Sequence, residues 1–510
     1  MGQGSFFAEL EESFARHRDR QAIYEPRTGR SLSYAELEAS IGAWAARLAA
    51  AGLVPGERVA VQVQKSLEAL LLYLACLRSG LIFLPLNPAY TAGELEHMLT
   101  DAEPALFVTD PAREAELAPL ARRHGVRLVW TLDAAGRARP WDAREPAPPP
   151  PPPVKGEDIA ALLYTSGTTG RPKGAPLAHR NLASNARVLV EAWGFTAEDV
   201  LLHALPIFHV HGLFIACHCA LLAGARMLWL PRFEAEEVVR LLPEATVFMG
   251  VPTMYVRLLE QPELTPERCR RMRLFISGSA PLPAQVWHAF KERTGHEILE
   301  RYGMSEILMH TGNPLHGERR PGTVGRPFPG SEVKIVDERG RALAPGRVGE
   351  VLVRGPNVFS GYWRRPQLQR EVFTEDGWFR TGDLGYLSED GYLTLVGRSK
   401  DLIITGGLNV YPKEVEEVLD SLPGVRESAV FGLPHPDFGE AVTAAVVPEP
   451  GSRWDERRLI AALKARLAGF KVPKRILRLD ELPRNSMGKI QKRVLRERFR
   501  RLYLAPEVGS

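Results

Sequence analysis

The sequence predicts an α/β protein with a large N-terminal domain, residues 1–398, and a small α+β C-terminal domain, residues 399–510. Three observations predict this fold class. With 510 residues, the chain is too long for one ordinary domain. Short apolar runs first alternate with helix-length runs, which is typical of two doubly wound α/β subdomains. After Tyr302 short strands separated by Gly, Pro and Asp turns indicate a β-barrel-like subdomain.

The first α/β subdomain is expected between residues 34 and 110. An amphipathic pattern predicts a helix over 34–51. Because the strands that follow are separated by whole helices, they should lie parallel. Strands are expected at 59–63, 81–86 and 105–110, and helices at 66–80 and 92–102.

The second α/β subdomain follows a run of six prolines, residues 148–153. Such a run is stiff and has no backbone donors, so we interpret it as a surface spacer rather than a recognition ligand. No short repeat is visible, which excludes solenoids and propellers. Strands are expected at 159–163, 200–206, 226–230, 246–250 and 273–278.

The turn-rich part should form the barrel-like piece, and a basic unit follows it. This unit begins beyond Arg398 and has roughly a hundred residues, a usual size for a small domain. The boundary is expected at Ser399 and Lys400. Strands of the barrel-like piece are expected at 333–337, 349–354, 378–381 and 392–396.

Composition limits the partners and the compartment. A net charge of +4 is small against 65 basic and 61 acidic residues, so no basic field for nucleic acid is expected. Four cysteines without a paired framework fit a reducing cytosol, and the apolar run at 70–77 is too short to span a bilayer. We therefore expect a cytoplasmic protein with small-molecule partners and no membrane insertion, and leave a homodimer open. One group of histidines and cysteines could be considered as a metal site, but its spacing matches no known zinc pattern, so no metal site is expected there. The group is His209, His211, Cys217, His218 and Cys219.

Residues 163–174, LYTSGTTGRPKG, are the most informative stretch of the chain. Glycines let backbone N–H groups turn toward an anion, while hydroxyls add donors and Lys173 adds a cation. The stretch follows a predicted buried strand, so it should be an exposed phosphate-binding loop. It does not fit the Walker pattern, because no Gly-Lys-Ser/Thr follows the spacer.

Four further stretches carry chemistry when they are taken together. GSAPL at 278–282 ends a strand with small residues, where a planar ligand can approach the backbone. ERYGMSE at 300–306 supplies an aromatic face and a carboxylate. TGD at 381–383 places an acid at a strand end, and PRNSMGKI at 483–490 presents a lysine on a turn. Each stretch alone is also compatible with an ordinary turn or helix start.

In this order and spacing, TSGTTGRPKG, YGMSE, TGD, GRSKDLIITGG and PRNSMGK resemble the acyl-adenylate-forming superfamily of acyl-CoA synthetases, nonribosomal adenylation domains and luciferases. The resemblance covers nearly the whole chain. It implies an AMP-forming ligase that uses ATP, Mg²⁺ and coenzyme A to join a carboxylic acid to a thiol. No side-chain nucleophile is needed, because Mg²⁺ and a lysine can neutralise charge at the α-phosphate.

The resemblance also implies a role for each matching residue. Lys489 would bridge the carboxylate and the α-phosphate, and Asp383 and Arg398 would hold the ribose hydroxyls. Glu306 would act in catalysis by holding Mg²⁺ together with Thr168. The expected triphosphate contacts are Thr165, Ser166, Gly167, Thr168, Thr169, Gly170 and Lys173. Further expected ATP contacts are Gly278, Ser279, Ala280, Pro281, Glu300, Arg301, Tyr302, Gly303, Met304 and Ser305.

A second step is implied, in which a thiol intercepts the adenylate. The small domain of the family swings about a hinge, here Lys400, because a few junction residues can absorb large dihedral changes. The rotation withdraws Lys489 and brings a glycine pair to the thiol tunnel. Phe438, Phe470 and the basic run at 471–475 resemble the coenzyme A contacts of some relatives, and the alternative is that they form an ordinary solvated surface. The expected coenzyme A contacts are Gly406, Gly407, Phe438 and Phe470.

The acyl pocket should be bordered by FHVHG at 208–212, with His209 at the family's gate position. Three arginines could bind a second substrate carboxylate, because a buried acid end needs a charge-assisted partner. These segments look closest to the malonyl-CoA synthetases, which implies malonate or methylmalonate. A medium- or long-chain fatty acid, an aryl acid and a stand-alone adenylation domain stay open as alternatives. The expected substrate contacts are His209, Arg273, Met309, Arg319 and Arg320.

Overall fold

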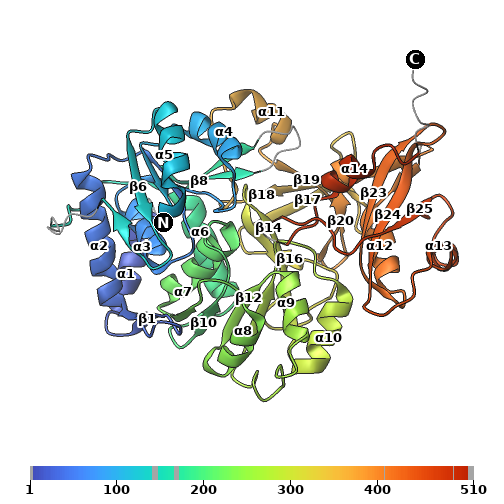
Figure 1. Ribbon diagram of the computed structural model, residues 1–510, viewed down its shortest axis with the longest axis horizontal. Helices are drawn as coiled ribbons and strands as arrows, with labels where there is room; N and C mark the ends of the chain where they lie inside the picture. Colours follow the sequence, from blue (N-terminus) through green and yellow to red (C-terminus); the bar gives the residue numbers. More distant parts are fainter. Residues whose placement is uncertain (1–3, 141–146, 166–171, 407, 486–487, 504–510) are drawn as a thin grey trace.

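The protein is a mixed α/β fold with a large N-terminal part and a small C-terminal part, as predicted. Figure 1 shows the C-terminal part, orange to red, against one end of the N-terminal part. No described helix is long and apolar enough to cross a membrane. The computed structural model describes residues 4–140, 147–165, 172–406, 408–485 and 488–503.

A seven-stranded sheet forms the first α/β subdomain, in the order β7-β6-β5-β3-β4-β8-β9. Its inner strands run parallel, and β7 and β9 pair antiparallel at the edges. The strands and helices predicted here are confirmed to within two residues. The strands are β3 (Arg58–Gln62), β4 (Ile82–Pro85), β5 (Leu106–Thr109), β6 (Leu128–Leu132), β7 (Ala138–Arg139), β8 (Ile159–Thr165) and β9 (Lys173–Ala178). The helices are α2 (Tyr34–Ala50), α3 (Leu67–Arg78), α4 (Ala92–Ala102) and α5 (Glu114–Arg123), with the 3₁₀ turn η1 (Pro111–Arg113).

A nine-stranded sheet forms the second subdomain, in the order β16-β15-β14-β13-β12-β10-β11-β1-β2. The strands from β14 to β1 in this order are parallel, and the other three pair antiparallel. Strand β10 ends three residues earlier than predicted, before Pro206, which cannot donate to a strand ladder.

The strands of this sheet are β1 (Gln21–Tyr24), β2 (Ser31–Ser33), β10 (Val200–His203), β11 (Arg226–Trp229), β12 (Val247–Gly250), β13 (Leu274–Ser277), β14 (Ile298–Met304), β15 (Leu308–Gly312) and β16 (Arg326–Pro327). Its helices are α1 (Phe6–Arg16), α6 (His179–Ala192), the π-helix η2 (His211–Cys217), α7 (His218–Ala223), α8 (Ala235–Leu241), η3 (Leu242–Glu244), α9 (Pro252–Leu259) and α10 (Ala284–Thr294).

Helix α3 lies between the two subdomains. It is buried on nearly all sides, as its almost continuous apolar sequence requires. The ring of Tyr73 on α3 lies 5.0 Å from that of Phe83 on β4 and 5.6 Å from that of Phe214 in η2. The two subdomains therefore share one hydrophobic core, which fixes their sheets relative to each other.

The turn-rich part forms an antiparallel meander, in the order β17-β18-β19-β20. Strand β19 is longer than predicted because it runs through TGD. The turn η5 (Ser399–Asp401) joins β20 to the C-terminal α+β part, whose strands order as β22-β21-β24-β23 with β25 beside β24. The elements are β17 (Glu332–Val336), β18 (Gly349–Arg354), η4 (Pro366–Leu368), α11 (Gln369–Val372), β19 (Phe379–Leu387) and β20 (Leu393–Arg398). Those of the C-terminal part are β21 (Ile403–Thr405), β22 (Leu408–Val410), α12 (Pro412–Asp420), β23 (Val425–His435), β24 (Gly439–Pro448), α13 (Glu456–Lys464), β25 (Arg475–Arg478) and α14 (Lys492–Phe499).

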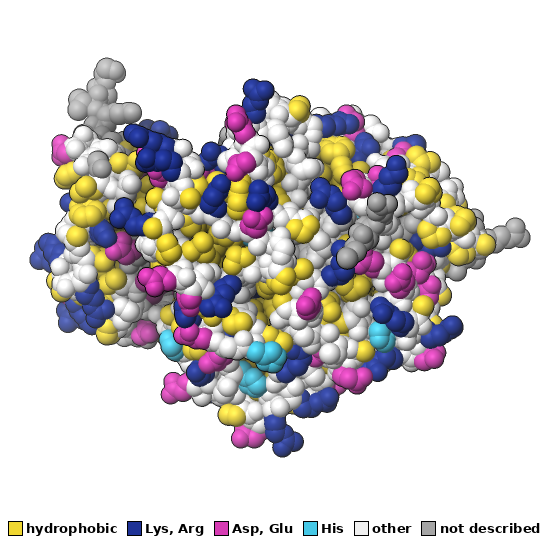
Figure 2. Space-filling model, turned by 180° about the vertical axis from the view of Figure 1, so that it is seen from behind, with side chains coloured by type: hydrophobic (Ala, Val, Ile, Leu, Met, Phe, Trp, Pro, Cys, Tyr) yellow, Lys and Arg dark blue, Asp and Glu magenta, His cyan; other side chains and the backbone are white. Residues whose placement is uncertain are grey.

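The carboxyl ends of the parallel strands carry the motifs. Strand β8 ends at the phosphate loop, β13 ends before GSAPL, and β14 leads into Glu306. Ligands of doubly wound folds bind at such strand ends. On the face seen in Figure 2, acidic and basic side chains are interspersed, in keeping with the nearly balanced charge of the chain.

Candidate active site

The two arms of the phosphate loop are the end of β8 and the start of β9, where Thr165 pairs with Lys173. The Thr165 hydroxyl donates to Oε1 of Glu306 at 3.1 Å. The loop therefore begins next to the carboxylate that we expected to hold a metal. The expected contacts between the arms lie outside the described residues: Ser166, Gly167, Thr168, Thr169 and Gly170.

Glu306 is only 3% exposed and also accepts a hydrogen bond from the Tyr362 hydroxyl, at 2.9 Å. Both hydroxyls bind Oε1, so Oε2 receives no hydrogen bond from the described residues. A fixed carboxylate with one available oxygen suits Mg²⁺, which prefers oxygen ligands. Tyr362 was missed by the sequence analysis, since an aromatic residue in a turn gives no signal of a charged partner.

The expected ribose residues form one cluster with the expected adenine residue. Asp383 and Arg398 lie opposite each other on β19 and β20, and Arg398 Nε donates to Asp383 at 2.6 Å. The Tyr302 hydroxyl donates to the other carboxylate oxygen at 2.5 Å. Asp383 raises the pKa of Arg398, and burial raises that of Tyr302, so the guanidinium stays charged and the phenol stays protonated.

Gly278 in the turn after β13 and Gly303 on β14 have no room for a side chain. A Cβ on Gly278 would lie 2.2 Å from Cζ of Arg301, and one on Gly303 would lie 1.9 Å from the carbonyl oxygen of Leu308. Ser279 has a φ of 71°, a left-handed conformation that is rare outside glycine. Only small residues fit here, as an expected adenine slot requires. Half-buried or exposed beside it are Ala280, Pro281, Met304 and Ser305.

Glu300 braces this turn. Its Oε1 accepts from the backbone N–H of Leu282 at 3.0 Å, while Oε2 has no partner among the described residues. Burial raises the pKa of Glu300 to about 7. Glu300 therefore holds the last residue of GSAPL, and its expected contact with ATP stays a prediction.

Arg301 is a buried cation without a carboxylate partner. It is 3% exposed, and its Nε and Nη2 have no hydrogen-bond partner among the described residues. Burial lowers its pKa to about 9. A buried guanidinium without a partner is costly to the folded state.

Two histidines stand near Arg301. Burial, followed by the positive charge of Arg301, lowers the pKa of His209 to about 4 and that of His211 well below its usual range. Both rings are therefore neutral near pH 7. His211 Nδ1 lies 3.3 Å from the Ser279 hydroxyl, and its Nε2 has no partner among the described residues. The cluster offers a cation and polar nitrogens to one small site.

Arg273 does not take part in that cluster, which corrects our expectation. Its Nε and Nη2 bind the two carboxylate oxygens of Asp199, each at 2.7 Å. Its remaining donors reach the carbonyl oxygens of Trp193 and Gly194. Because the whole guanidinium fork is used within the protein, Arg273 is not available to a substrate carboxylate.

Arg319 and Arg320 are likewise occupied, and the expectation for them is also corrected. Arg319 donates to three backbone carbonyl oxygens at 2.6–3.2 Å. Arg320 pairs with Glu318 and Asp390 at 2.8 and 2.7 Å. Arg319 and Arg320 therefore stabilise a turn of the protein and are not free to bind a substrate in the acyl site. Met309, by contrast, is buried on β15, with its methyl group close to the Gly303 backbone.

Lys489 reaches the N-terminal part from the C-terminal part. A Cβ on the preceding Gly488 would lie 2.8 Å from the Thr253 hydroxyl, so this turn packs on α9. Lys489 as a whole is exposed, although protein surrounds its amine. Desolvation by that protein and the charge of Arg398 lower the pKa of Lys489. Lys413 on α12 also crosses the cleft and donates to the carbonyl oxygen of Leu395 at 2.9 Å.

The expected thiol contacts are spread over the C-terminal part. The backbone N–H of Gly406 donates to the Phe438 carbonyl at 2.8 Å, and the Phe438 ring is 38% exposed. Phe470 packs instead against the core of the C-terminal part. Gly407 lies outside the described residues. The expected hinge, Lys400, is in η5.

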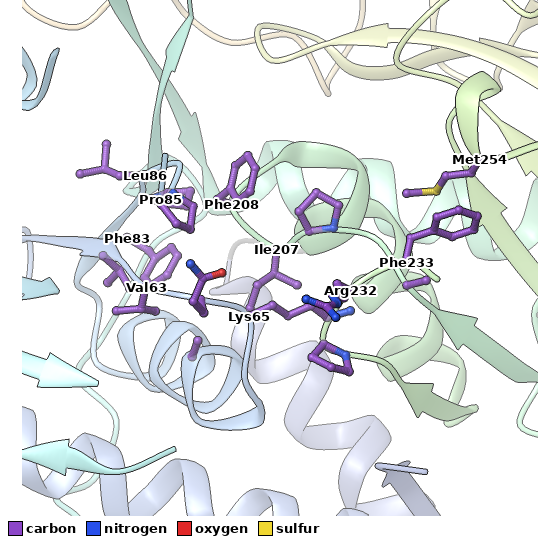
Figure 3. Close-up of a pocket in the computed structure, with 17 residues that line it drawn as sticks. Val63, Lys65, Phe83, Pro85, Leu86, Ile207, Phe208, Arg232, Phe233 and Met254 are labelled. Carbon is purple, nitrogen blue, oxygen red and sulfur yellow. The ribbon is translucent and has the colours of Figure 1, made fainter. Parts of the chain in front are cut away.

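A cavity of about 210 Å³ opens between the two α/β subdomains (Figure 3). Phe83 and Lys65 come from the first subdomain, and Phe208 and Met254 from the second. None of its lining residues is acidic. Phe208 precedes His209, so the cavity borders the cluster around Arg301. Burial lowers the pKa of Lys65 to about 7.

Comparison with known proteins finds relatives that match nearly the whole chain. A model of AMP-binding enzymes matches residues 10–363, and a model of the AMP-binding enzyme C-terminal domain matches residues 414–489. The malonate–CoA ligase of Arabidopsis thaliana is 37% identical over 480 residues, which cover 88% of this chain and 78% of that protein. The feruloyl-CoA synthase of an Amycolatopsis species is 38% identical over 477 residues, 92% of this chain and 94% of that protein. The crystal structure of ATP-bound MatB from Rhodopseudomonas palustris is 49% identical, with a TM-score of 0.95, and the match covers 99% of this chain and 100% of that one.

Proposed function

We propose, from the premise that this chain belongs to the family of AMP-binding enzymes, that the acid it activates is malonate or methylmalonate. The chain is an ATP-dependent acyl-CoA ligase, which forms an acyl adenylate and then a coenzyme A thioester. It uses ATP, Mg²⁺ and coenzyme A. Similarity to a malonate–CoA ligase supports the choice of a diacid.

The observation that carries the proposal is the unpaired guanidinium of Arg301. A second carboxylate entering the pocket would lose its hydration, and Arg301 has already lost its own. The attraction between the carboxylate and the guanidinium would offset the free energy that both groups lose when they leave water. The free Nε2 of the neutral His211 supplies a further polar contact. A fatty acid would leave the buried cation without a partner.

In the first step, the substrate carboxylate attacks the α-phosphorus of ATP and pyrophosphate leaves. Lys489 neutralises charge that develops around the α-phosphate, while Asp383 and Tyr302 fix the nucleoside. Glu306 would hold Mg²⁺ together with Thr168, and the bound ion would screen the phosphate charges. Lys173 would hold the outer phosphates.

In the second step, the thiol sulfur attacks the acyl carbon, the bond to AMP breaks, and the thiol proton is lost. The cavity beside Phe208 would admit the thiol-bearing arm, because it is largely apolar and borders the acyl site. We propose that the C-terminal part, residues 399–510, rotates about Lys400 between the steps and brings Gly406 and Phe438 to the N-terminal part, residues 1–398.

Two further proposals concern the setting of the enzyme. The four free cysteines are all buried, which supports a cytoplasmic protein. A homodimer also remains a proposal, which light scattering would test.

A panel of acids tests the substrate. Each acid is assayed separately, and we expect coenzyme A-dependent AMP release to be faster with malonate or methylmalonate than with acetate, octanoate, palmitate, benzoate or ferulate. Preference for octanoate or palmitate would favour a fatty acid ligase, and preference for benzoate or ferulate an aryl acid ligase. AMP formation that does not respond to coenzyme A would favour a stand-alone adenylation domain.

A further inference from the structure

Tyr362 lies between the two oppositely charged residues of the phosphate site. Its hydroxyl donates to Oε1 of Glu306 at 2.9 Å, and its ring centroid is 5.2 Å from Nζ of Lys173. No ion pair joins Lys173 to Glu306 in the part of the chain that the structure describes. The ring therefore occupies the place through which the lysine would approach the carboxylate.

The backbone around Tyr362 is tied to both of these charged residues. The N–H of Phe359 donates to the carbonyl oxygen of Glu306 at 2.8 Å, and the N–H of Trp363 donates to that of Gly174, next to Lys173, at 2.8 Å. The Phe359 and Tyr362 rings also pack edge to face at 5.0 Å. Tyr362 is thus held on both sides.

A second set of contacts anchors the same segment to the first α/β subdomain. Asp101 on α4 accepts from the Tyr164 hydroxyl at 2.7 Å and from Arg365 at 2.7 Å, and its carbonyl oxygen accepts from Trp363 Nε1 at 3.1 Å. Tyr164 is on β8, one residue before Thr165. The segment that carries Tyr362 is therefore braced against the strand that opens the phosphate loop.

We propose that Tyr362 is a positioning residue for metal-bound ATP, a role that rests on the proposed function. Its hydroxyl fixes Oε1 of Glu306 and leaves Oε2 for the metal. Its ring holds the Lys173 ammonium beside the carboxylate without an ion pair, in a cation–π contact that bound phosphates can replace. Both charged groups then meet metal and phosphate without first breaking a bond to each other.

Titration calorimetry with ATP, in the absence of any acid substrate, tests this role. Tyr362→Phe keeps the ring and removes the hydroxyl, so we expect ATP to bind about tenfold more weakly in saturating Mg²⁺ and equally well in EDTA. Tyr362→Leu also removes the ring, so Lys173 can pair with Glu306, and the loss in Mg²⁺ should be larger. The melting temperature measures any structural damage separately.

Tyr392→Phe is the matched control. The Tyr392 hydroxyl donates to a carbonyl at 2.7 Å and its ring lies 4.1 Å from the Arg320 guanidinium, yet it contacts neither Lys173 nor Glu306. Its ATP affinity should not change in either buffer. Equal losses for Tyr362→Phe with and without Mg²⁺, or no loss at all, would overturn the proposal. Failure of the unmodified protein to bind ATP in Mg²⁺ would count instead against the proposed function.

Discussion

Arg273 donates to both carboxylate oxygens of Asp199, at 2.7 Å each, so its guanidinium is already paired within the protein. Arg301, which is more deeply buried, has two guanidinium nitrogens without partners among the described residues. An arginine is available to a substrate only when the fold leaves its donors free. The contrast between these two residues is why we propose Arg301, rather than Arg273, as the contact for a second substrate carboxylate.

Arg301→Met should reduce kcat/KM for malonate about tenfold to a hundredfold and leave that for butyrate unchanged or higher. The variant removes the cation that a second carboxylate would need. It should not lower the melting temperature, since replacing an unpaired buried charge with an apolar side chain is not destabilising. Steady-state AMP release with both acids, together with thermal melting, checks this.

Arg320→Met serves as the control for Arg301, because Arg320 pairs with the acidic residues Glu318 and Asp390 and lies over the ring of Tyr392. It should leave the ratio of malonate to butyrate activity unchanged. If Arg301→Met lowered kcat/KM for malonate and butyrate by the same factor, Arg301 would not be the contact for a second carboxylate.

Lys489→Ala should slow adenylate formation about a hundredfold to a thousandfold, the usual cost of removing one charge-stabilising donor. Thioester formation from supplied acyl adenylate should stay measurable, because the lysine is not needed once the adenylate exists. ATP–pyrophosphate exchange reports the first step and coenzyme A consumption the second. Lys492→Ala, which removes an amine that pairs with Glu416, is the control. Equal loss of both steps would refute the role of Lys489.

Met254→Trp should raise KM for coenzyme A several-fold and leave ATP–pyrophosphate exchange unchanged. Met254 lines the cavity between the α/β subdomains, and a larger side chain there would obstruct the thiol-bearing arm. Val256→Trp, on the same helix, is the control, since Val256 is 37% exposed and does not line the cavity. An unchanged KM in Met254→Trp would mean that the thiol enters elsewhere.

Asp420→Asn should raise the melting temperature by a few degrees above pH 7 and give no gain near pH 4. Burial raises the pKa of Asp420 to about 7, above the value of about 3.9 in an unfolded chain. The folded state therefore keeps this proton up to a higher pH than the unfolded state does. The stability that the protonated Asp420 contributes is lost as pH rises from about 4 to about 7. Asparagine has no such proton to lose. Thermal melting across this range checks it, and an equal gain at every pH would show that ionisation is not the cause.

Much of the fold follows from local patterns. Most of the parallel strands, and α3, were predictable because a strand or helix buried on all sides must be apolar along its whole length, whereas the parallel strands β6 and β14 were missed. Strands β1 and β2 were not, since β1 pairs with β11, about two hundred residues away in sequence, and the edge strand β2 pairs with β1.

The nucleotide residues could also be named from the sequence, because a phosphate loop, a metal-binding acid and a catalytic lysine each need particular residue types. Their partners could not. Tyr362 carries no charge and sits in a turn, and its importance appears only where its hydroxyl meets Glu306. The three expected acyl arginines failed for the related reason that sequence gives a charge but not its partner.

The phosphate loop, Glu306, Asp383 and Lys489 were thus determined by the sequence itself, because adenylate chemistry requires these groups whatever acid is used. Tertiary structure alone decided which arginine keeps donors without partners among the described residues. Arg273, Arg319 and Arg320 are satisfied by acids and carbonyls that folding brings to them, whereas burial deprives Arg301 of water and gives it no carboxylate in exchange. The specificity that we propose rests on Arg301, which folding desolvates without giving it a carboxylate partner among the described residues, and only the tertiary structure reveals this.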